Sequence, residues 1–449
     1  MAKSLTTGTP AILILKFALP LLAGNLFQQI YNMADTLIVG RTLGVHVLAS
    51  VGSTGSLMFL IIGFIQGMSS GFAIVTAQYF GARRLSDVRM SFCVSIILAT
   101  LVGLILTTLS YTYADDILRL MRTPPEVIDG AYAYISTLYL GLGSFIMFNL
   151  LASTILALGD SKTPLFFLII ACIVNIALDF AFILWLGWGV AGASRATITA
   201  QSLSALLCAV YLVRRQPALL LRRKDWLRVT FRALVRSAKI GLPMGFQASI
   251  IAIGAIILQW ALNSLGPISV ASYAVAQKID IVGTLPLMSF GLAMATYTGQ
   301  NYGAGEIGRI RKGVRQCAAI SLTFSVLAGA AVIVGGKYLI ALFVGPDQPE
   351  VMANAQTYLT INGSLYWILA LLFIFRYTLQ GLGQSVVPTV AGIMELVMRA
   401  LGALVLLQLY GFTGVCVSNP LAWIGSCLPL GIAYAISVRK LPAGVPGVR

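Results

Sequence analysis

The sequence is poor in charged residues and in the side chains that enzymes most often use for chemistry. Only 10% of its 449 residues are charged, His46 is the single histidine, and the six cysteines show no CxxC spacing. A lone histidine and isolated cysteines leave little material for a catalytic triad or a zinc site. We therefore expect a protein that is not an enzyme, that holds no cofactor and that has no structural metal.

Apolar residues dominate the composition. The AVILMFWYC class makes up 58% of the chain and the mean hydropathy is +0.91, far above the range of soluble globular domains. Because a membrane-spanning helix needs about 20 apolar residues, the apolar stretches that recur between residues 11 and 436 fit twelve spans. The predicted spans are 12–39, 49–79, 90–112, 132–158, 164–186, 190–213, 238–262, 270–300, 316–338, 356–380, 387–409 and 414–436. We expect an all-α integral membrane protein with no sizeable soluble domain.

The net charge of +16 comes from basic residues that lie mainly on one side of the predicted spans. They precede the first span, fill the even-numbered loops or follow the last span, and nine of them lie between residues 214 and 239. Acids such as Asp115 and Glu350 lie in the opposite loops. The positive-inside rule then places both termini in the cytoplasm. The basic charge therefore indicates topology in a bacterial inner membrane, and we expect no nucleic-acid partner.

An internal repeat divides the chain into two halves. The segment 78–82, Gln-Tyr-Phe-Gly-Ala, reappears as Gln-Asn-Tyr-Gly-Ala at 300–304, an offset of 222 residues. Leu158-Gly159 reappears as Leu382-Gly383 at an offset of 224. With six spans each, both halves enter the membrane from the same side and are expected to be related by an axis along the membrane normal. Parallel repeats of this kind are typical of transporters that hold substrate between the halves.

The repeat predicts two pseudo-symmetric six-helix bundles, an amino-terminal lobe at 1–213 and a carboxy-terminal lobe at 240–449. The basic segment 214–239 would connect them in the cytoplasm. Its leucines, Trp226 and Phe231 stand among the bases, which favours an amphipathic helix on the anionic inner leaflet and makes membrane lipids expected partners. A solvated linker that carries topology charge explains the same composition.

Two acids in the amino half lie inside predicted spans without a nearby base. An ionised carboxylate at the centre of a membrane helix costs about 3 kcal/mol on insertion scales, so Asp35 and Asp179 need a partner, a proton or water. Asn175 precedes Asp179 by one helical turn, and Thr197 returns to a similar depth in the next span. Carboxylate, amide and hydroxyl oxygens suit H⁺ or a small alkali cation such as Na⁺. The alternative is that Asp35 ends its helix and Asp179 hydrogen-bonds within its bundle.

The carboxy half carries intramembrane charges of both signs. These are Lys278, Asp280, Arg376, Glu395 and Arg399. No acid stands opposite Asp179, and Asn175 corresponds to Arg399 at an offset of 224. By depth, Arg376 is expected to meet Glu395, and Arg399 to meet Asp280. Such pairs are more often a structural network than a binding site, although they can also exchange partners during a conformational change.

These features together resemble the multidrug and toxic compound extrusion family, MATE. The resemblance covers essentially the whole chain and rests on an early Leu-Pro in each half, Asp35, the paired Gln-x-[Phe/Tyr]-Gly-Ala segments and Leu-Gly-Asp-Ser-Lys-Thr-Pro at 158–164. The polar set of the amino half described above is similar to the amino-lobe cation site of the DinF-like branch. The NorM-like branch uses acids in spans 7 and 10, whereas this chain has no acid in span 7 and Arg376 in span 10.

The resemblance implies a transporter that exports organic cations or other amphipathic compounds in exchange for H⁺ or Na⁺ by alternating access. Asp35 and Asp179 would take up the ion, and the change in their charge would bias the packing of the first span, where Pro20 permits a bend. Small-molecule substrates would contact residues that face the cleft between the lobes. We expect these residues to include Gln28, Met33, Phe148, Asn149 and Met288. We also expect a monomer.

Other functions fit parts of the same pattern. A flippase for a lipid-linked saccharide, or an exporter dedicated to one metabolite, would share the fold and the repeat. A membrane-embedded lipid transferase would need a catalytic constellation, which the sequence does not supply. A channel fits poorly with intramembrane charges that differ between the halves. The sequence leaves the choice between H⁺ and Na⁺ open.

Overall fold

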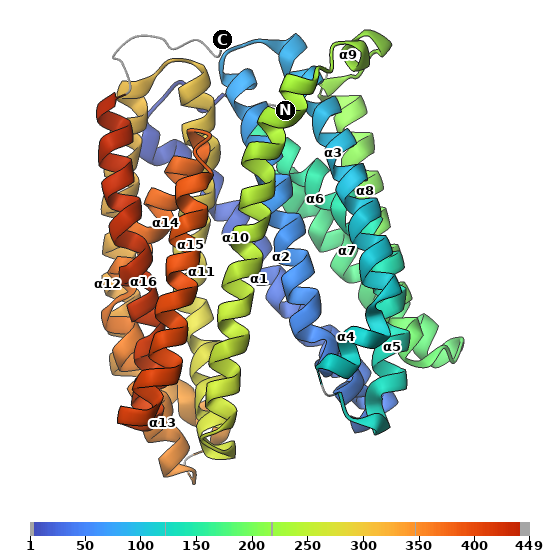
Figure 1. The fold of residues 1–449 in the computed structure, drawn as a ribbon, viewed down its shortest axis with the longest axis vertical. Helices are drawn as coiled ribbons and strands as arrows, with labels where there is room; N and C mark the ends of the chain where they lie inside the picture. Colours follow the sequence, from blue (N-terminus) through green and yellow to red (C-terminus); the bar gives the residue numbers. More distant parts are fainter. Residues whose placement is uncertain (1–3, 122, 217–218, 346, 441–449) are drawn as a thin grey trace. The chain divides into compact units, whose positions relative to one another are not determined.

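The computed structural model describes residues 4–121, 123–216, 219–345 and 347–440, which are almost all helical and form no β-strand. The elements of the amino half are α1 (Pro10–Leu43), α2 (Val45–Gly81), α3 (Leu85–Thr112), α4 (Ala114–Leu120), α5 (Pro125–Leu140), α6 (Leu142–Ala157), α7 (Lys162–Phe180), the π-helical turn η1 (Ala181–Trp185), α8 (Gly189–Arg215) and α9 (Arg223–Leu227). Those of the carboxy half are α10 (Phe231–Asn263), α11 (Pro267–Gly303), α12 (Ile307–Val344), α13 (Pro349–Ser364), α14 (Tyr366–Gly381), α15 (Val386–Leu401), the π-helical turn η3 (Gly402–Leu406) and α16 (Leu407–Lys440). Figure 1 labels these helices, and the predicted all-α class is confirmed.

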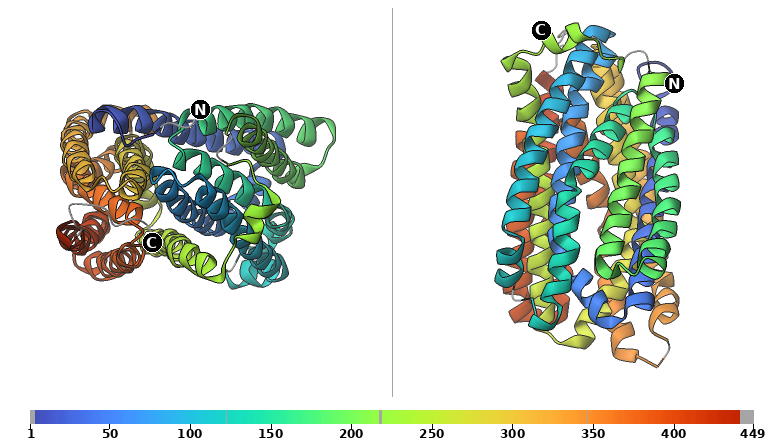
Figure 2. Two further views of the ribbon diagram at one scale, coloured as in Figure 1. Left: turned by 90° about the horizontal axis from the view of Figure 1, so that it is seen from above. Right: turned by 90° about the vertical axis from the view of Figure 1, so that its right-hand side faces the viewer.

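Contacts divide the helices into two compact units, each with its own apolar core. The first unit contains Ala23–Gly245, and the second contains Leu5–Leu22 and the residues from Phe246 onward. Phe72 is fully buried in the core of the first unit and Tyr358 in the core of the second. Figure 2 shows the helices from two further directions. Apolar burial between neighbouring helices therefore stabilises each unit from within.

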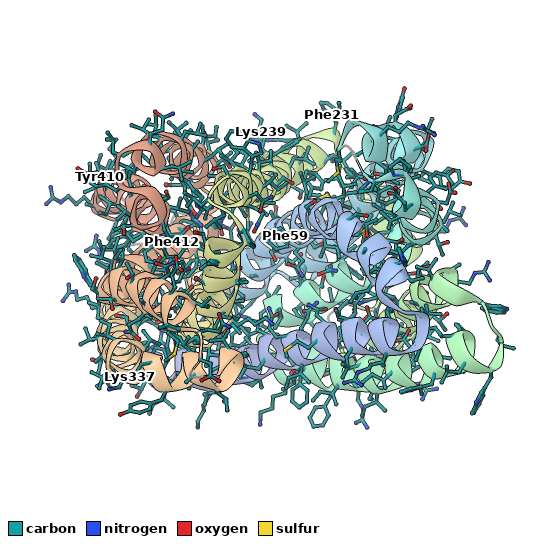
Figure 3. All side chains as sticks on the ribbon, turned by 90° about the horizontal axis from the view of Figure 1, so that it is seen from below. Phe59, Phe231, Lys239, Lys337, Tyr410 and Phe412 are labelled. Carbon is teal, nitrogen blue, oxygen red and sulfur yellow. The ribbon has the colours of Figure 1, made fainter. Side chains whose placement is uncertain are left out.

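Large apolar side chains cover the outside of the helices. Leu342 is 82% exposed, Val334 74% and Tyr410 66%, and Figure 3 shows Tyr410 projecting outward from its helix. Extensive apolar surface of this kind is unfavourable in water but suits contact with lipid tails. The surface therefore agrees with the membrane location that the composition predicts.

Nine helical segments of the described chain are long and apolar enough to cross a membrane, or eleven when each of two bent helix pairs counts as one span. The bent pairs are α5 with α6, at 48°, and α13 with α14, at 50°. One of the nine segments, Val386–Lys440, is 55 residues long and is interrupted at Gly411, where φ is 57° and ψ is −132°. Division at Gly411 yields the predicted spans 11 and 12. The described residues therefore fit twelve spans, two of which are bent where the sequence predicts single helices.

The internal repeat extends to the backbone. Helices α5 and α6 begin and end 224 residues before α13 and α14, so the two bends fall at equivalent positions. Gly44 has a φ of 87° and its counterpart Gly266 a φ of 89°. Gly159 and its counterpart Gly383 have φ of 82° and 83°. Because residues with a Cβ atom rarely adopt positive φ, glycine at these four turns lets both halves follow the same path.

Glycines also allow α2 to approach the first turns of α10 within the first unit. A Cβ atom at Gly67 would overlap the Met244 carbonyl oxygen, and one at Gly71 would overlap the Cα atom of Gly241. Small residues permit this close backbone packing between membrane helices. The contact explains why the beginning of α10 belongs to the first unit.

The connector between the halves is less helical than its composition predicts. Among the described residues of this segment, α8 continues to Arg215, Arg223–Leu227 forms the separate helix α9, and α10 begins at Phe231. No single helix therefore runs through the described part of 214–239, and contact of this segment with the inner leaflet stays a prediction. The basic residues lie instead at the ends of two long helices and around the short helix α9.

A buried ion pair fixes α9 to the start of α3. Asp225, only 1% exposed, accepts hydrogen bonds from Arg89 Nε at 3.2 Å and from the Arg222 backbone N–H at 2.8 Å. Burial alone would raise the pKa of Asp225, but these donors outweigh burial and hold the pKa below its usual range. A second, more exposed pair joins Arg228 to Asp87 at 3.1 Å.

Replacement of Asp225 with Ala is expected to destabilise the protein by about 2 kcal/mol, because Arg89 and the Arg222 N–H lose a charged acceptor. Since the folded-state pKa of Asp225 is lowered, its stabilisation is present above the unfolded-state value of about 3.9. It is lost as the pH falls through the lower folded-state value. Unfolding in detergent, followed by circular dichroism at pH 7 and below pH 4, measures both effects.

Asp115→Ala is the matched control for this measurement. Asp115 pairs with Arg119 across one helical turn on the surface, where the side chains are 48% and 68% exposed. Exposed pairs contribute little because water and salt screen them, so stability should stay unchanged. An equal loss of stability in the two variants would contradict a special role for the buried pair.

Candidate functional site

Helices α1, α7 and α8 bring the predicted polar residues of the amino half together in the first unit. Asp179 is fully buried, Asn175 and Thr197 are buried, and Asp35 is partly buried. The carboxyl groups of Asp35 and Asp179 lie within hydrogen-bonding reach of each other. The Oδ1 atom of each acid has no hydrogen-bond partner among the described residues. The cluster thus contains two acids with remaining capacity to bind a proton or a cation.

Asn175 connects this acid pair to α8. In the amide orientation that satisfies both neighbours, its Nδ2 donates to Asp179 Oδ2 at 3.0 Å and its Oδ1 accepts from the Thr197 N–H at 3.1 Å. Asn175 and Asp179 lie one turn apart on α7, so the helix itself holds them on one face. The amide therefore fixes the position of the Asp179 carboxyl group.

Two tyrosines that the sequence analysis missed complete the cluster. The Tyr31 hydroxyl hydrogen-bonds to Thr197, and Tyr31 lies close to both acids. Tyr134 of α5 is also buried and close to both acids. Tyr31 precedes Asp35 by one helical turn, and this spacing is a signal that could have found it. Tyr134 is placed only by the packing of α5, for which the sequence offers no local signal.

The close approach of the two acids has a direct electrostatic consequence. Two ionised carboxylates repel and cannot hydrogen-bond to each other, so the contact between Asp35 and Asp179 requires a shared proton or a cation. Hydroxyl oxygens from Thr197 and Tyr31 lie around the pair and are also suitable ligands for Na⁺, whereas the Asn175 amide turns its N–H toward Asp179. The described chain contains no group of three or more His, Cys, Asp or Glu side chains that would suit a metal ion. The site fits a monovalent cation.

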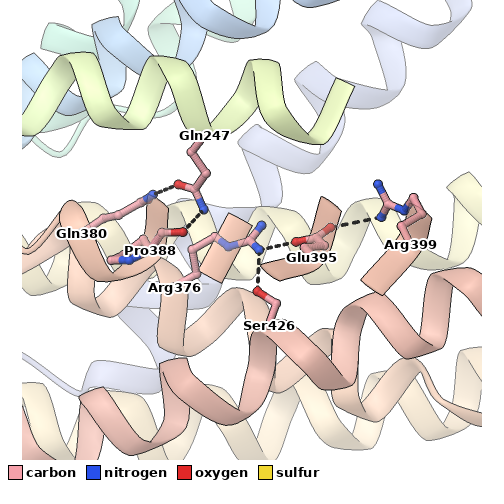
Figure 4. A network of polar contacts seen from close by, with 7 residues as sticks. All are labelled: Gln247, Arg376, Gln380, Pro388, Glu395, Arg399 and Ser426. Atoms are coloured by element: carbon pink, nitrogen blue, oxygen red, sulfur yellow. Dashed lines mark hydrogen bonds and ion pairs between the residues drawn. The ribbon is translucent and has the colours of Figure 1, made fainter. Parts of the chain in front are cut away.

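In the second unit, Glu395 of α15 lies between two arginines (Figure 4). One of its oxygens accepts from Arg376 Nη2 at 2.5 Å and the other accepts from Arg399 Nη2 at 3.1 Å. Arg376 also donates to Ser426 Oγ at 3.1 Å. All three charged side chains are at least nine-tenths buried. The pairing of Arg376 with Glu395 is the one that their depth along the spans predicts.

Asp280 lies outside this arginine–glutamate cluster, so the expected pairing of Arg399 with Asp280 is wrong. Arg399 reaches Glu395 one turn away on its own helix, whereas Asp280 accepts hydrogen bonds from the hydroxyl groups of Tyr366, at 2.7 Å, and Tyr358. Lys278 is exposed, with its Nζ 5.9 Å from the centre of the Phe343 ring. Within the described chain Lys278 has no carboxylate partner, and it does not join the network.

The five residues predicted to contact substrate lie on α1, α6 and α11. Met33 is 63% exposed, while the other four are partly buried: Gln28, Phe148, Asn149 and Met288. The Asn149 amide donates to the carbonyl oxygen of Phe145 in its own helix at 2.8 Å. Their role in substrate contact stays a prediction.

The fold and the site together define a class of protein. Two repeated helical units, each bent at equivalent positions, and a buried pair of acids without a fixed cation are the arrangement of a secondary transporter. Unpaired ionisable residues inside membrane helices are rare, and they mark candidate ion or substrate sites.

Comparison with known proteins then identifies the family. The MatE family model matches residues 20–181 and again 243–405, one match in each half. The chain belongs to the MatE family, whose members are multidrug efflux transporters, bind small molecules and are not enzymes. The resemblance noted from the sequence is thereby confirmed, and the double match agrees with the internal repeat.

Relatives with similar sequences carry names of the same kind. "Probable multidrug resistance protein YpnP" of Bacillus subtilis is 26% identical over 384 residues, which cover 85% of each chain. "Multidrug export protein MepA" of Staphylococcus aureus is 21% identical over 407 residues, covering 90% of this chain and 88% of the relative. A solved outward-facing structure of a multidrug resistance MATE family transporter of the MOP superfamily aligns with a TM-score of 0.89 at 22% identity, over 97% and 98% of the two chains. The full-length fold is therefore shared.

The tyrosine–aspartate contact in the second unit generates a stability prediction. Replacement of Tyr366 with Phe removes a hydrogen-bond donor from the buried carboxylate of Asp280 and is expected to cost about 2 kcal/mol. Tyr377→Phe is the matched control on the same helix, since the Tyr377 ring packs against Phe373 and no hydrogen bond of its hydroxyl is found among the described residues. Unfolding in mixed micelles measures both variants. Equal stability of the two would show that the Tyr366 hydroxyl is dispensable.

Proposed function

We propose that the protein is a cation-coupled multidrug efflux antiporter of the bacterial inner membrane. It exports organic cations or other amphipathic compounds by alternating access, in exchange for inward H⁺ or Na⁺. The single observation that carries the proposal is the contact between the carboxyl groups of Asp35 and Asp179 inside the first unit. This contact depends on a bound proton or cation, so ion binding and helix packing are linked.

The energy available from this contact is large enough to drive a conformational change. Two like unit charges about 4 Å apart repel by about 4 kcal/mol at an effective dielectric constant of 20. A two-state equilibrium moves from 1:99 to 99:1 with about 5.5 kcal/mol. Loss of the ion from the pair therefore supplies most of the free energy needed to reverse the preferred state. Asp35 lies on α1 and Asp179 on α7, so the ion favours the state in which these helices meet.

Substrate and ion need not touch for exchange to occur. If the substrate binds better to the state that the ion disfavours, each weakens the binding of the other by the same factor. Pro20 removes a backbone hydrogen bond from α1 and gives this helix a place to bend. The five predicted contact residues on α1, α6 and α11 are the substrate side of the proposal.

The class of substrate follows from the relatives. Proteins that match this chain over 85% or more of its length are named for multidrug resistance or multidrug export. Asp35 and Asp179 of the first unit, together with the absence of an acid in predicted span 7, favour the DinF-like branch of the family. Both termini lie in the cytoplasm in this proposal, because basic residues gather in the even-numbered loops. The transporter acts as a monomer.

Transport into inverted membrane vesicles tests the proposal. Ethidium uptake by vesicles that contain the purified protein is expected only when a proton or sodium gradient is imposed, and the gradient that works identifies the ion. Asp35→Asn and Asp179→Asn are each expected to lower the rate at least tenfold, because the pair then loses its charge switch. Exposed Asp129, on the first turns of α5, supplies the control variant Asp129→Asn, which should transport normally.

Two results would contradict the proposal in different ways. Full ethidium transport by folded Asp35→Asn and Asp179→Asn variants would remove the acid pair from the mechanism. Absence of gradient-driven uptake for ethidium and other cationic dyes in the folded wild type would remove the multidrug substrate class. The second result would support an exporter of one metabolite or a flippase for a lipid-linked saccharide.

A further inference from the structure

The two units differ in charge at one equivalent position. Arg399 of α15 stands 224 residues after Asn175 of α7, the same offset that relates α5 and α6 to α13 and α14. In the first unit this position supplies a neutral amide to the acid pair. In the second unit it supplies a guanidinium group that is permanently charged.

The guanidinium group of Arg399 is held inside the second unit. It is 7% exposed and donates to Glu395 at 3.1 Å. A Cβ atom at Gly254 of α10 would lie 3.0 Å from Arg399 Nη1, so the arginine packs directly against the backbone of that helix. Glycine at this position leaves the space that the guanidinium group occupies. The cation is therefore fixed from two sides, by an acid and by packing.

The second unit balances its own buried charges. Arg376 and Arg399 contribute two positive charges, and Glu395 and Asp280 contribute two negative charges, so the sum is zero. Asp280 is not in direct contact with either arginine, but its carboxylate accepts two tyrosine hydroxyl groups. Local hydrogen bonds and the nearby surplus guanidinium together replace the solvation that Asp280 loses.

A polar side-chain bridge links Asp280 to the arginines. Tyr273 interacts electrostatically with both Arg399 and Asp280. Asn419 donates to the Tyr273 hydroxyl at 3.3 Å and to the Tyr358 hydroxyl at 3.4 Å, and Tyr358 in turn hydrogen-bonds to Asp280. The four charges thus belong to one connected region of the unit.

The first unit has no such internal balance. Its cluster contains two acids, Asp35 and Asp179, surrounded by amide and hydroxyl groups, and no ion pair involves either acid in the described chain. If both acids ionise, two negative charges remain without a fixed counter-charge. Only a mobile cation or proton can supply it.

We propose that Arg399 is a tethered cation, a guanidinium group that neutralises the second unit permanently and so confines ion coupling to the acid pair of the first unit. This inference rests on the proposed function. The second unit then packs in the same way whether or not the coupling ion is present. The charged and titratable groups that face this cluster come from α11, α13, α14, α15 and α16, and they are Tyr273, Asp280, Tyr358, Tyr366, Arg376, Tyr377, Glu395, Arg399, Cys416 and Cys427.

Removal of the tethered cation should create a new ion site. The test uses the full chain in which Asp35→Asn and Asp179→Asn remove both acids of the first unit. This double variant is called the silenced background. In this background, Arg399→Gln leaves one positive and two negative charges in the second unit, so one H⁺ or Na⁺ should bind per protein. The measurements are proton uptake between pH 8 and pH 5.5 and thermal stability in NaCl against choline chloride at equal ionic strength.

Two further variants serve as controls in the same background. Arg399→Lys keeps the positive charge and should bind no additional ion. Arg399→Gln combined with Glu395→Gln restores neutrality with one charge of each sign and should also bind none. If folded Arg399→Gln shows no ion response beyond the background, the tethered-cation inference is overturned.

The behaviour of the background separates this inference from the proposed function. If the silenced background shows neither proton uptake nor a stability change in NaCl, the acid pair is supported as the coupling site. If the background keeps an ion response that Glu395→Gln or Asp280→Asn removes, the native second unit binds the ion and the tethered-cation inference fails. If both variants leave that response intact, the coupling site lies elsewhere and the proposed function fails.

Infrared spectroscopy gives a second measurement that needs no arginine variant. In the silenced background, Glu395 and Asp280 should stay ionised near neutral pH, so no band of a buried protonated carboxyl group should appear between pH 8 and pH 7. Appearance of such a band, with its loss in Glu395→Gln or Asp280→Asn, would overturn the inference. This result holds even if Arg399→Gln does not fold.

Discussion

An ionised side chain inside a membrane protein has no bulk water to solvate it, and the protein must supply a counter-charge, a proton or hydrogen bonds. The first unit leaves Asp35 and Asp179 in contact and without a base. The second unit places Glu395 between Arg376 and Arg399 and gives Asp280 two tyrosine hydroxyl groups. In the proposed mechanism, the same constraint is met by a mobile ion in one unit and by fixed side chains in the other, so that only the first unit would respond to ions.

The repeated backbone allows the two units to differ in buried charge while they keep the same helix path. Equivalent bends interrupt α5–α6 and α13–α14, and glycines at equivalent turns, such as Gly44 and Gly266, share positive φ. Because these features fix where each helix begins and how it packs, a side chain at a given position in one half has a counterpart at a similar depth in the other. The first half has Asn175 at one such position, and the second half has Arg399 at the equivalent position. This difference alters the charge of the unit and leaves the backbone path unchanged.

The sequence predicts those features that depend on local periodicity. Helix-length apolar runs predict the twelve spans, and the one-turn spacing of Asn175 and Asp179 predicts their shared face. It does not predict the two bends, because no proline marks them, or the position of Tyr134, which depends on how α5 packs. Depth alone also paired Arg399 with the wrong acid. Glu395 lies one turn from Arg399 on the same helix and is the acid that Arg399 contacts. Asp280 is hydrogen-bonded by tyrosines instead, and these tyrosine contacts are seen only in the folded structure.

A transporter built from two similar units gains from this asymmetry. If both units changed their packing on ion binding, their two free-energy contributions would add only when both favoured the same conformation of the transporter. Otherwise the two contributions would cancel. A unit with balanced charges instead acts as a fixed reference, so the whole free energy of ion binding at Asp35 and Asp179 acts on the packing of one unit. Coupling to substrate then requires only that the substrate distinguishes the two packing states of that unit. The proposed neutralising role gives a function to the buried arginines, which add little net stability by themselves.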